Sequence, residues 1–272
     1  MSNAFLDTTI FCDALGLSTP ARKQVASSAL AKYQKTEAPF YALKELRAGP
    51  LASWILAHNI LVAHNTILEA VDRISRATAF KPRQGSVASK AIISGMVAVL
   101  AQIKISKNPK DYDEKTELEN YLCRYIFKQW QKRRTIVNQI VQPLSCFIDS
   151  DLILDGKLIR FAGDSPECSK ASSCGAAIEL KKYPEEIDKI LIALRPPKTI
   201  AGTEKRETTR RRAALKEVLN RASNEFPRKD CRALGDAYFC IMAPSNSEIL
   251  TTNASDFEPM TQVLNKILTI PS

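Results

Sequence analysis

Acidic residues follow short apolar segments near both ends of this chain, and this arrangement limits how the two ends can fold. Asp7 comes directly after the apolar residues 4–6, and Asp256 comes shortly after the apolar residues 249–250. A carboxylate at the carboxyl end of a buried strand loses hydration that only a cation or hydrogen-bond donors can replace. In a parallel α/β sheet, the residues just beyond the carboxyl ends of the strands meet in one crevice. We therefore expect an α/β fold in which both ends of the chain build one short parallel sheet.

The middle of the chain has a helical pattern and one hairpin signal. Apolar residues recur at helical spacing from residue 51 to about residue 78, and the stretches 86–104 and 114–141 continue in the same manner. Asp155-Gly156 separates two apolar runs and readily adopts the positive φ angles of a tight turn, which predicts a β-hairpin over 151–162. The other expected elements are strands at 3–6 and 248–251 and helices at 18–35, 38–47, 176–194, 204–222, 230–243 and 257–268.

The charge balance favours an anionic polymer as partner. Lys and Arg number 39 against 29 Asp and Glu, which gives a formal net charge of +10. Two basic runs are candidates for holding a nucleic-acid backbone, and an ordinary solvated helix face is the alternative for each. The candidate residues are Arg210, Arg211, Arg212, Lys132, Arg133 and Arg134.

The cysteines and the apolar segments bear on location. Seven cysteines are an odd number and show neither CxxC pairs nor a zinc-type Cys/His rhythm, so reduced thiols in a cytoplasm fit best. The N-terminus lacks the features of a secretory signal, and no uninterrupted apolar segment reaches the ~20 residues that span a bilayer. We expect a cytoplasmic protein with no membrane contact.

Four acidic residues form one candidate metal site. They are Asp7, Glu45, Asp236 and Asp256. Several carboxylates at one point repel each other, and Mg²⁺ or Mn²⁺ with oxygen ligands relieves this repulsion while keeping water molecules for chemistry. The sequence therefore predicts a divalent-metal site.

The motifs around these acids resemble those of the PIN domain, the PilT N-terminus-like family of metal-dependent nucleases. Phe5-Leu6-Asp7-Thr8-Thr9-Ile10 is similar to the family's first strand, which ends in an Asp-Thr/Ser motif. Leu43-Lys44-Glu45-Leu46 resembles its acidic-Leu helix, and Leu234-Gly235-Asp236-Ala237 resembles the motif of its third acid. Residues 249–257 resemble the variant in which Asn253 replaces an Asp and the fourth acid lies in Asp256-Phe257.

The resemblance implies a three-layer PIN-like fold with a short parallel sheet. It assigns residues 1–48 and 228–272 to a discontinuous catalytic domain, and 49–227 to a large, mainly helical insertion that contains the hairpin. The four acids would hold one or two Mg²⁺ or Mn²⁺ ions for hydrolysis of phosphodiesters. RNA is favoured as the substrate, and the sequence leaves DNA open. Thr8, Thr251 and Asn253 would orient ligands or water molecules.

Three alternatives remain open from the sequence. Cys146-Phe147-Ile148-Asp149 also resembles the opening of a PIN domain, in which case Asp149 and Glu179 would replace Asp7 and Glu45. The protein could instead be a catalytically silent RNA-binding or scaffold protein with the same fold. It could also be a toxin-like nuclease that an inhibitory protein partner controls.

Overall fold

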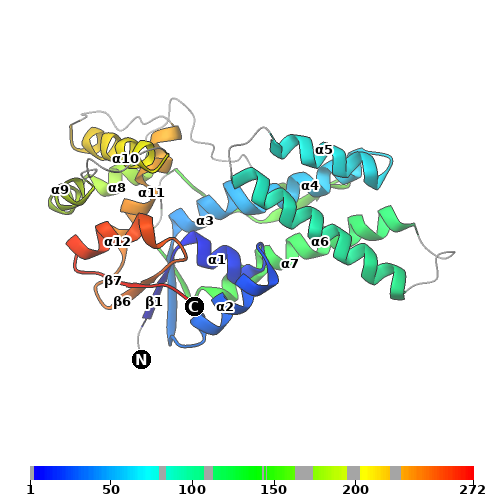
Figure 1. Ribbon diagram of the computed structural model, residues 1–272, viewed down its shortest axis with the longest axis horizontal. Helices are drawn as coiled ribbons and strands as arrows, with labels where there is room; N and C mark the ends of the chain where they lie inside the picture. Colours follow the sequence, from blue (N-terminus) through cyan, green and yellow to red (C-terminus); the bar gives the residue numbers. More distant parts are fainter. Residues whose placement is uncertain are drawn as a thin grey trace.

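The core of the molecule is a parallel sheet built from both ends of the chain. A computed structural model describes residues 3–79, 84–106, 113–142, 144, 146–162, 174–194, 203–220 and 228–272. Within these residues the larger sheet has five strands in the order β3-β2-β1-β6-β7, and each neighbouring pair is parallel (Figure 1). The strands are β1 (Asn3–Leu6), β2 (Lys35–Pro39), β3 (Gln139–Val141), β6 (Ser247–Leu250) and β7 (Ile267–Thr269). The prediction of an α/β class with a short parallel sheet is confirmed.

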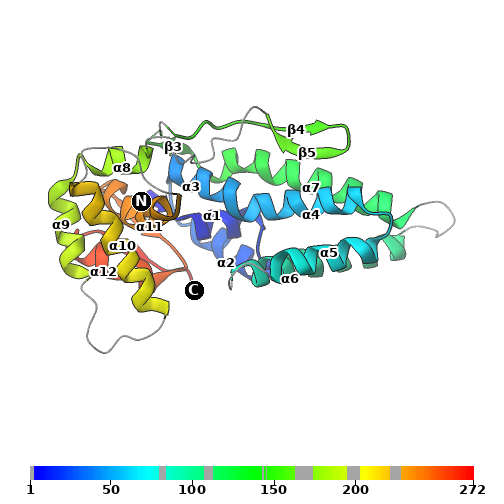
Figure 2. The same ribbon diagram turned by 90° about the horizontal axis from the view of Figure 1, so that it is seen from above.

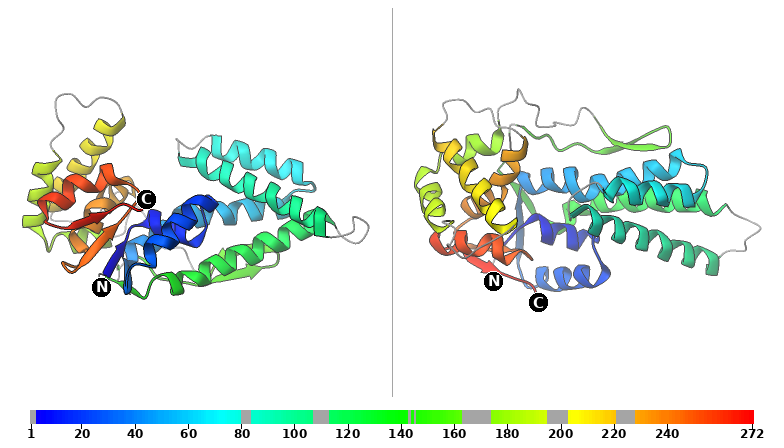
Figure 3. Two further views of the ribbon diagram at one scale, coloured as in Figure 1. Left: turned by 60° about the horizontal axis from the view of Figure 1, so that its bottom comes forward. Right: turned by 45° about the horizontal axis from the view of Figure 1, so that its top comes forward.

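The direction of the strand connections reverses at the centre of the sheet. The chain moves from β1 outward to β2 and β3, and then returns to the other side of β1 for β6 and β7. Because parallel crossovers are right-handed, helices before and after this reversal must cover opposite faces. Helices α1 (Thr8–Leu15), α2 (Pro20–Leu30) and α7 (Glu114–Ile136) lie on one side of the strands, and α11 (Arg228–Met242) and α12 (Ala254–Val263) lie on the other (Figures 1 and 3). The reversal places a topological switch point between β1 and β6.

Aromatic packing fixes the second helical layer on the sheet. The Phe5 ring of β1 meets the Phe239 ring of α11 edge-on at 6.3 Å, and Phe239 meets Phe257 of α12 at 6.1 Å. All three side chains are almost completely buried. Asp236 lies about one helical turn before Phe239, and Asp256 directly precedes Phe257. This packing therefore fixes where both acids lie relative to the strands.

A helical projection extends from the first half of the chain. Helix α3 (Phe40–Leu46) continues through a π-helical turn, Arg47–Leu51, into α4 (Ala52–Ala63). Helix α4 packs against α5 (Ile67–Ala79), α6 (Gln84–Ser106) and α7, and Figure 2 shows these helices projecting away from the sheet. None of the described helices is long and apolar enough to cross a membrane.

Two predicted helix boundaries in this projection are wrong for local reasons. Gly49-Pro50 was expected to stop a helix, but the π-helical turn accommodates Pro50, which has no N–H to donate. The predicted helix 51–78 breaks after Ala63, because Thr66 and Glu69 cap a new helix. The Thr66 hydroxyl accepts from the Glu69 N–H at 3.2 Å, and the Glu69 carboxylate accepts from the Thr66 N–H at 3.2 Å.

Other short elements also differ from the prediction. The hairpin is confirmed as β4 (Leu152–Asp155) and β5 (Leu158–Phe161), with Gly156 at φ +61° in the turn. Helix 176–194 is two helices, α8 (Gly175–Leu180) and α9 (Pro184–Ala193), because Pro184 starts a new one. The basic helix is α10 (Thr203–Asn220), and residues 221–222 of the predicted helix lie outside the described residues. Strand segments at 35–39, 139–141 and 267–269 and helix 8–15 were not predicted.

Part of the segment 49–227 belongs to the sheet and its helix layer. Strand β3 pairs with β2, from Glu37↔Gln139 to Pro39↔Val141, so this segment supplies an edge strand of the sheet. Helices α8, α9 and α10 pack against α11, and α9 also packs against α12. The sheet and its helix layer therefore include residues on both sides of the predicted domain boundaries. Helices α4 to α7 and the hairpin that packs on α4 extend away from this layer (Figure 2).

Candidate functional site

The first acid lies at the switch point, between two neighbouring strands. The register Leu6↔Leu250 places Asp7 and Thr251 side by side, one residue beyond the ends of β1 and β6. The Asp7 N–H donates to the Leu250 carbonyl at 3.0 Å. The Thr251 and Thr9 hydroxyls each donate to Asp7 Oδ2 at 2.7 Å. Burial raises the pKa of the Asp7 carboxyl group, and these two hydroxyl bonds oppose the rise.

Glu45 reaches the same point from α3. The Thr8 hydroxyl donates to Glu45 Oε2 at 2.6 Å, which links α3 to the first residue of α1. Burial raises the pKa of Glu45 to about 8; the Thr8 bond lowers it, and the charges of Asp236 and Asp7 raise it further. The side chains of Asp7, Glu45 and Asp236 are therefore close enough to repel one another.

Asp236 enters the cluster because α11 approaches α3 closely. A Cβ atom added at Gly235 would lie 2.9 Å from the Tyr41 ring, so only glycine allows this approach. The Tyr41 hydroxyl also donates to the Cys231 carbonyl of α11 at 2.8 Å, which fixes the two helices together. Burial raises the pKa of Asp236 to about 7; Arg211 lowers it, and the charges of Asp256 and Asp7 raise it.

The fourth acid is tied to the first through Asn253. The Asn253 side-chain amide donates to Asp256 Oδ2, and its backbone N–H donates to the Thr251 hydroxyl at 3.0 Å. Thr251 in turn donates to Asp7. Three residues were predicted to orient ligands. Thr8 donates a hydrogen bond to Glu45, and Thr251 and Asn253 together connect Asp7 with Asp256.

An arginine occupies the position between two of these acids. Arg211 Nη2 pairs with Asp236 Oδ2 and lies 3.2 Å from Asp256 Oδ1, and the Arg211 side chain is only 9% exposed. With Arg211 in this position, the described part of the chain has no group of three or more His, Cys, Asp or Glu side chains that could hold a metal ion. The carboxylate oxygens are the donors that Mg²⁺ and Mn²⁺ prefer, so the chemistry of the site fits such an ion, although Arg211 now supplies the positive charge.

The other predicted basic residues divide into structural and exposed ones. Arg212 donates to the Leu191 carbonyl at the end of α9, whereas Arg210 is exposed. The Arg133 guanidinium is buried 3.7 Å from the centre of the Trp130 ring and pairs with Asp149 at 3.1 Å.

Lys132 belongs to a basic surface that joins two helices. Partial burial lowers its pKa, and the nearby charges of Lys23 in α2 and Lys128 in α7 lower it further. Arg134, which neighbours Lys132 in sequence, pairs with Asp151 at 3.4 Å. Lys23, Lys128 and Lys132 are therefore the residues of this surface whose positive charges lie near one another.

The alternative opening motif lies elsewhere in the fold. Asp149 is in an irregular segment rather than at the end of a strand, and it pairs with Arg133. Glu179 pairs with Lys182 at 2.8 Å. Neither is among the charges that shift the pKa of Asp236, whereas Asp7 is. The geometry therefore favours Asp7 and Glu45 over Asp149 and Glu179 as members of the acidic site.

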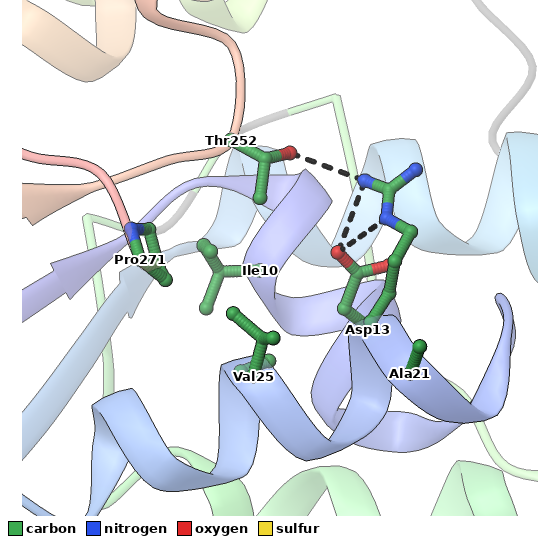
Figure 4. A pocket seen from close by; sticks show the side chains of 8 residues that line it. Ile10, Asp13, Ala21, Val25, Thr252 and Pro271 are labelled. Carbon is green, nitrogen blue, oxygen red and sulfur yellow. Dashed lines mark hydrogen bonds and ion pairs between the residues drawn. The ribbon is translucent and has the colours of Figure 1, made fainter.

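A small cavity is lined by residues of α1 and α2 and by Thr252 and Pro271 (Figure 4). Its volume is about 240 Å³, and its lining residues are Ile10, Asp13, Ala21, Arg22, Val25, Ala26, Thr252 and Pro271. Arg22 pairs with the buried Asp13 at 3.0 Å and donates to the Thr252 hydroxyl at 3.1 Å. The Thr252 N–H donates to Thr9, which itself donates to Asp7, so one cavity wall is connected to the acidic site.

Sequence reasoning missed three contributors to this site. Thr9 is visible in the Asp7-Thr8-Thr9 motif, but only the contact shows that its hydroxyl serves Asp7. Gly235 is visible beside Asp236, but its need for glycine depends on Tyr41. The inward position of Arg211 had a clearer signal, because it lies at helical spacing from three buried residues of α10.

Comparison with protein-family models, with curated proteins and with solved structures finds no match.

The raised pKa of Glu45 predicts how stability depends on pH in the metal-free protein. Between its ordinary pKa of 4.5 and about 8, folded Glu45 binds a proton that the unfolded chain releases, so its contribution to stability falls as pH rises. Glu45→Gln cannot ionise and still accepts from Thr8. In EDTA at pH 9 it should raise the free energy of unfolding by more than about 1.4 kcal/mol, the equivalent of one pKa unit. Urea unfolding should show this gain disappearing near pH 4, and a gain equal at both pH values would contradict the argument.

Proposed function

We propose that the protein is a divalent-metal-dependent nuclease with a PIN-like fold that hydrolyses phosphodiesters in RNA. One observation carries the proposal: four carboxylates, at the end of β1 and in α3, α11 and α12, gather beside a topological switch point. Hydrogen bonds through Thr251 and Asn253 link Asp7 to Asp256, Arg211 links Asp256 to Asp236, and the charges of Asp236 and Asp7 act on Glu45. Such crevices are where open α/β sheets bind ligands. Carboxylates with raised pKa values in a cleft are also typical of sites that bind cations or transfer protons.

Each residue has a defined task in this proposal. Asp7, Glu45, Asp236 and Asp256 would hold Mg²⁺ or Mn²⁺, which when bound supplies an activated water molecule and stabilises charge on the phosphate oxygens. Thr9 and Thr251 fix the orientation of the Asp7 carboxylate from two directions, and Thr8 does the same for Glu45. Asn253 bonds both Asp256 and Thr251, and Thr251 bonds Asp7. A substitution at Asn253 or Thr251 should therefore disturb both Asp7 and Asp256.

Nucleic acid is the anionic polymer that best fits the surface. The whole chain carries a net charge of +10 although it includes these four acids, and Lys23, Lys128 and Lys132 lie near one another. The exposed Arg210 is a further candidate for phosphate contact. The resemblance of the motifs to PIN domains favours RNA over DNA. Cys12, Cys123 and Cys240 are free thiols, which supports a cytoplasmic location.

Cleavage of labelled RNA tests the proposal. Purified protein should cut a single-stranded RNA in the presence of Mn²⁺ or Mg²⁺ and leave it intact in EDTA, and restoring Mn²⁺ should restore cutting. A DNA of the same sequence in parallel reactions separates the two substrate classes. RNA that is bound but not cut at any Mn²⁺ concentration would contradict the nuclease proposal.

A catalytically silent RNA-binding protein is the second candidate. The observation that favours it is Arg211, which already neutralises Asp236 and Asp256 without a metal. RNA binding that is unaffected by Mn²⁺, with no cleavage, would support this candidate. A toxin-like nuclease under an inhibitory partner would instead cut RNA only after that partner is removed.

A further inference from the structure

Arg211 stands at a position where the helix pattern calls for an apolar residue. Ala214, Leu215 and Val218 are buried at three, four and seven positions after it, so all four side chains belong to one inward face of α10. Arg211 itself is 7% exposed. A guanidinium on the buried face of a helix is costly unless its charge is paired.

The guanidinium is paired through one nitrogen atom with two acids of the site. Arg211 Nη2 contacts Asp236 Oδ2 and Asp256 Oδ1, which come from different helices, α11 and α12. A single cationic atom therefore stands between two carboxylates that are both expected to be metal ligands. Removing it without replacement would leave two acids facing each other.

We propose that Arg211 is a built-in counterion that competes with the divalent metal for Asp236 and Asp256. Binding of the metal then requires Arg211 to leave both carboxylates, so the position of α10 controls the metal affinity of the site. A divalent cation bound to the oxygen atoms that now contact Arg211 Nη2 would lie next to the guanidinium, and the two positive charges would repel each other. The inference rests on the proposed function, because it assumes that these acids bind metal.

The affinity for Mn²⁺ alone tests the competition without any activity assay. Arg211→Met keeps most of the side-chain length and removes the charge, so it should bind Mn²⁺ about tenfold more tightly than wild type, by calorimetry or by the electron paramagnetic resonance of free Mn²⁺. Arg211→Lys retains a cation and should stay much closer to wild type. Arg206→Met removes the same charge from an exposed position of α10 and should leave the affinity unchanged. Equal or weaker binding by folded Arg211→Met would overturn the inference.

A measurement on the wild-type protein keeps the test valid if Arg211→Met fails to fold. Mn²⁺ should accelerate amide hydrogen exchange in α10 around residue 211, because the metal releases the contact that holds this helix to α11 and α12. Unchanged or slower exchange in α10 at saturating Mn²⁺ would overturn the inference. If wild type binds Mn²⁺ and Asp236→Asn does not, the proposed metal site stands. A negative result for Arg211 would then overturn only the inference about competition. If neither wild type nor Arg211→Met binds Mn²⁺, the inference and the proposed metal site fail together.

Discussion

Asp236→Asn is expected to lower the rate of metal-dependent RNA cleavage by about 1,000-fold or more. The substitution keeps the shape of the side chain but removes a negatively charged oxygen ligand. A bound metal supplies several kcal/mol of charge stabilisation in the transition state, and each 1.36 kcal/mol corresponds to a factor of ten in rate. Asp236 should matter strongly because its carboxylate is only 28% exposed and lies among the charges of Asp256 and Asp7.

RNA affinity should respond in the opposite direction. Asp236→Asn removes a negative charge near the phosphate and frees Arg211 from one of its two acids, so binding should be unchanged or tighter. Single-turnover cleavage and filter binding, performed on the same preparation, measure the two effects separately. Asp188→Asn on the exposed surface of α9 is a matched control and should leave both unchanged. Cleavage by Asp236→Asn at the wild-type rate would mean that this carboxylate is not a ligand.

The ends of the chain were predictable because their signals are local. Residues 4–6 and 249–250 are continuous apolar runs, as buried parallel strands require, and a polar residue follows each run. In the structure, hydrogen bonds through Thr251 and Asn253 link Asp7 at one end to Asp256 at the other. The same argument worked for Asp155-Gly156, because two residues suffice to specify a hairpin turn.

Strand β2 could not be recognised, because its partners are remote in sequence. The segment Lys35–Pro39 contains the buried polar residues Thr36 and Glu37, which do not resemble a strand of a parallel sheet. The Thr36 hydroxyl donates to the Ile136 carbonyl at 2.7 Å, and its N–H donates to Asn138 Oδ1 at 2.7 Å. These bonds span about a hundred positions, so no local pattern predicts that the polar groups of this strand are satisfied. Strand β3 was not predicted either, because the helical pattern over 114–141 includes its residues, Gln139–Val141.

The roles of the basic residues depended on tertiary contacts. Three consecutive arginines are spread around a helix at ~100° each, so only the neighbours decide which one faces inward. In α10 the inward residue is Arg211, which meets acids, while Arg212 meets a carbonyl of α9 and Arg210 stays exposed. The spacing of the apolar residues Ala214, Leu215 and Val218 is the sequence signal that assigns Arg211 to the inward face of α10.

Trp130→Ala is expected to lower the free energy of unfolding by about 3–5 kcal/mol, the largest stability effect that we predict. Trp130 belongs to α7 and is 2% exposed. Its ring packs against the hairpin, where it meets Phe161 of β5 edge-on at 5.4 Å. Removing the indole leaves a cavity and also takes away the aromatic face beneath the Arg133 guanidinium. Arg133 is 3% exposed, so water cannot readily replace that lost contact.

Urea unfolding followed by circular dichroism measures this loss, with two variants as controls. Tyr121→Ala on the same helix removes a ring that is 36% exposed and should cost about 1 kcal/mol or less. Trp130→Phe should cost less than Trp130→Ala, because the indole N–H has no hydrogen-bond partner among the described residues. A loss below about 1 kcal/mol for Trp130→Ala would contradict the burial of this side chain against the hairpin. Lys132→Ala, two positions away, should instead weaken RNA binding, because it removes a cation near Lys23 and Lys128. It should not lower stability, because these two lysines repel the charge that is lost. Opposite outcomes at these two positions would separate the side of α7 that holds the fold from the side that meets RNA.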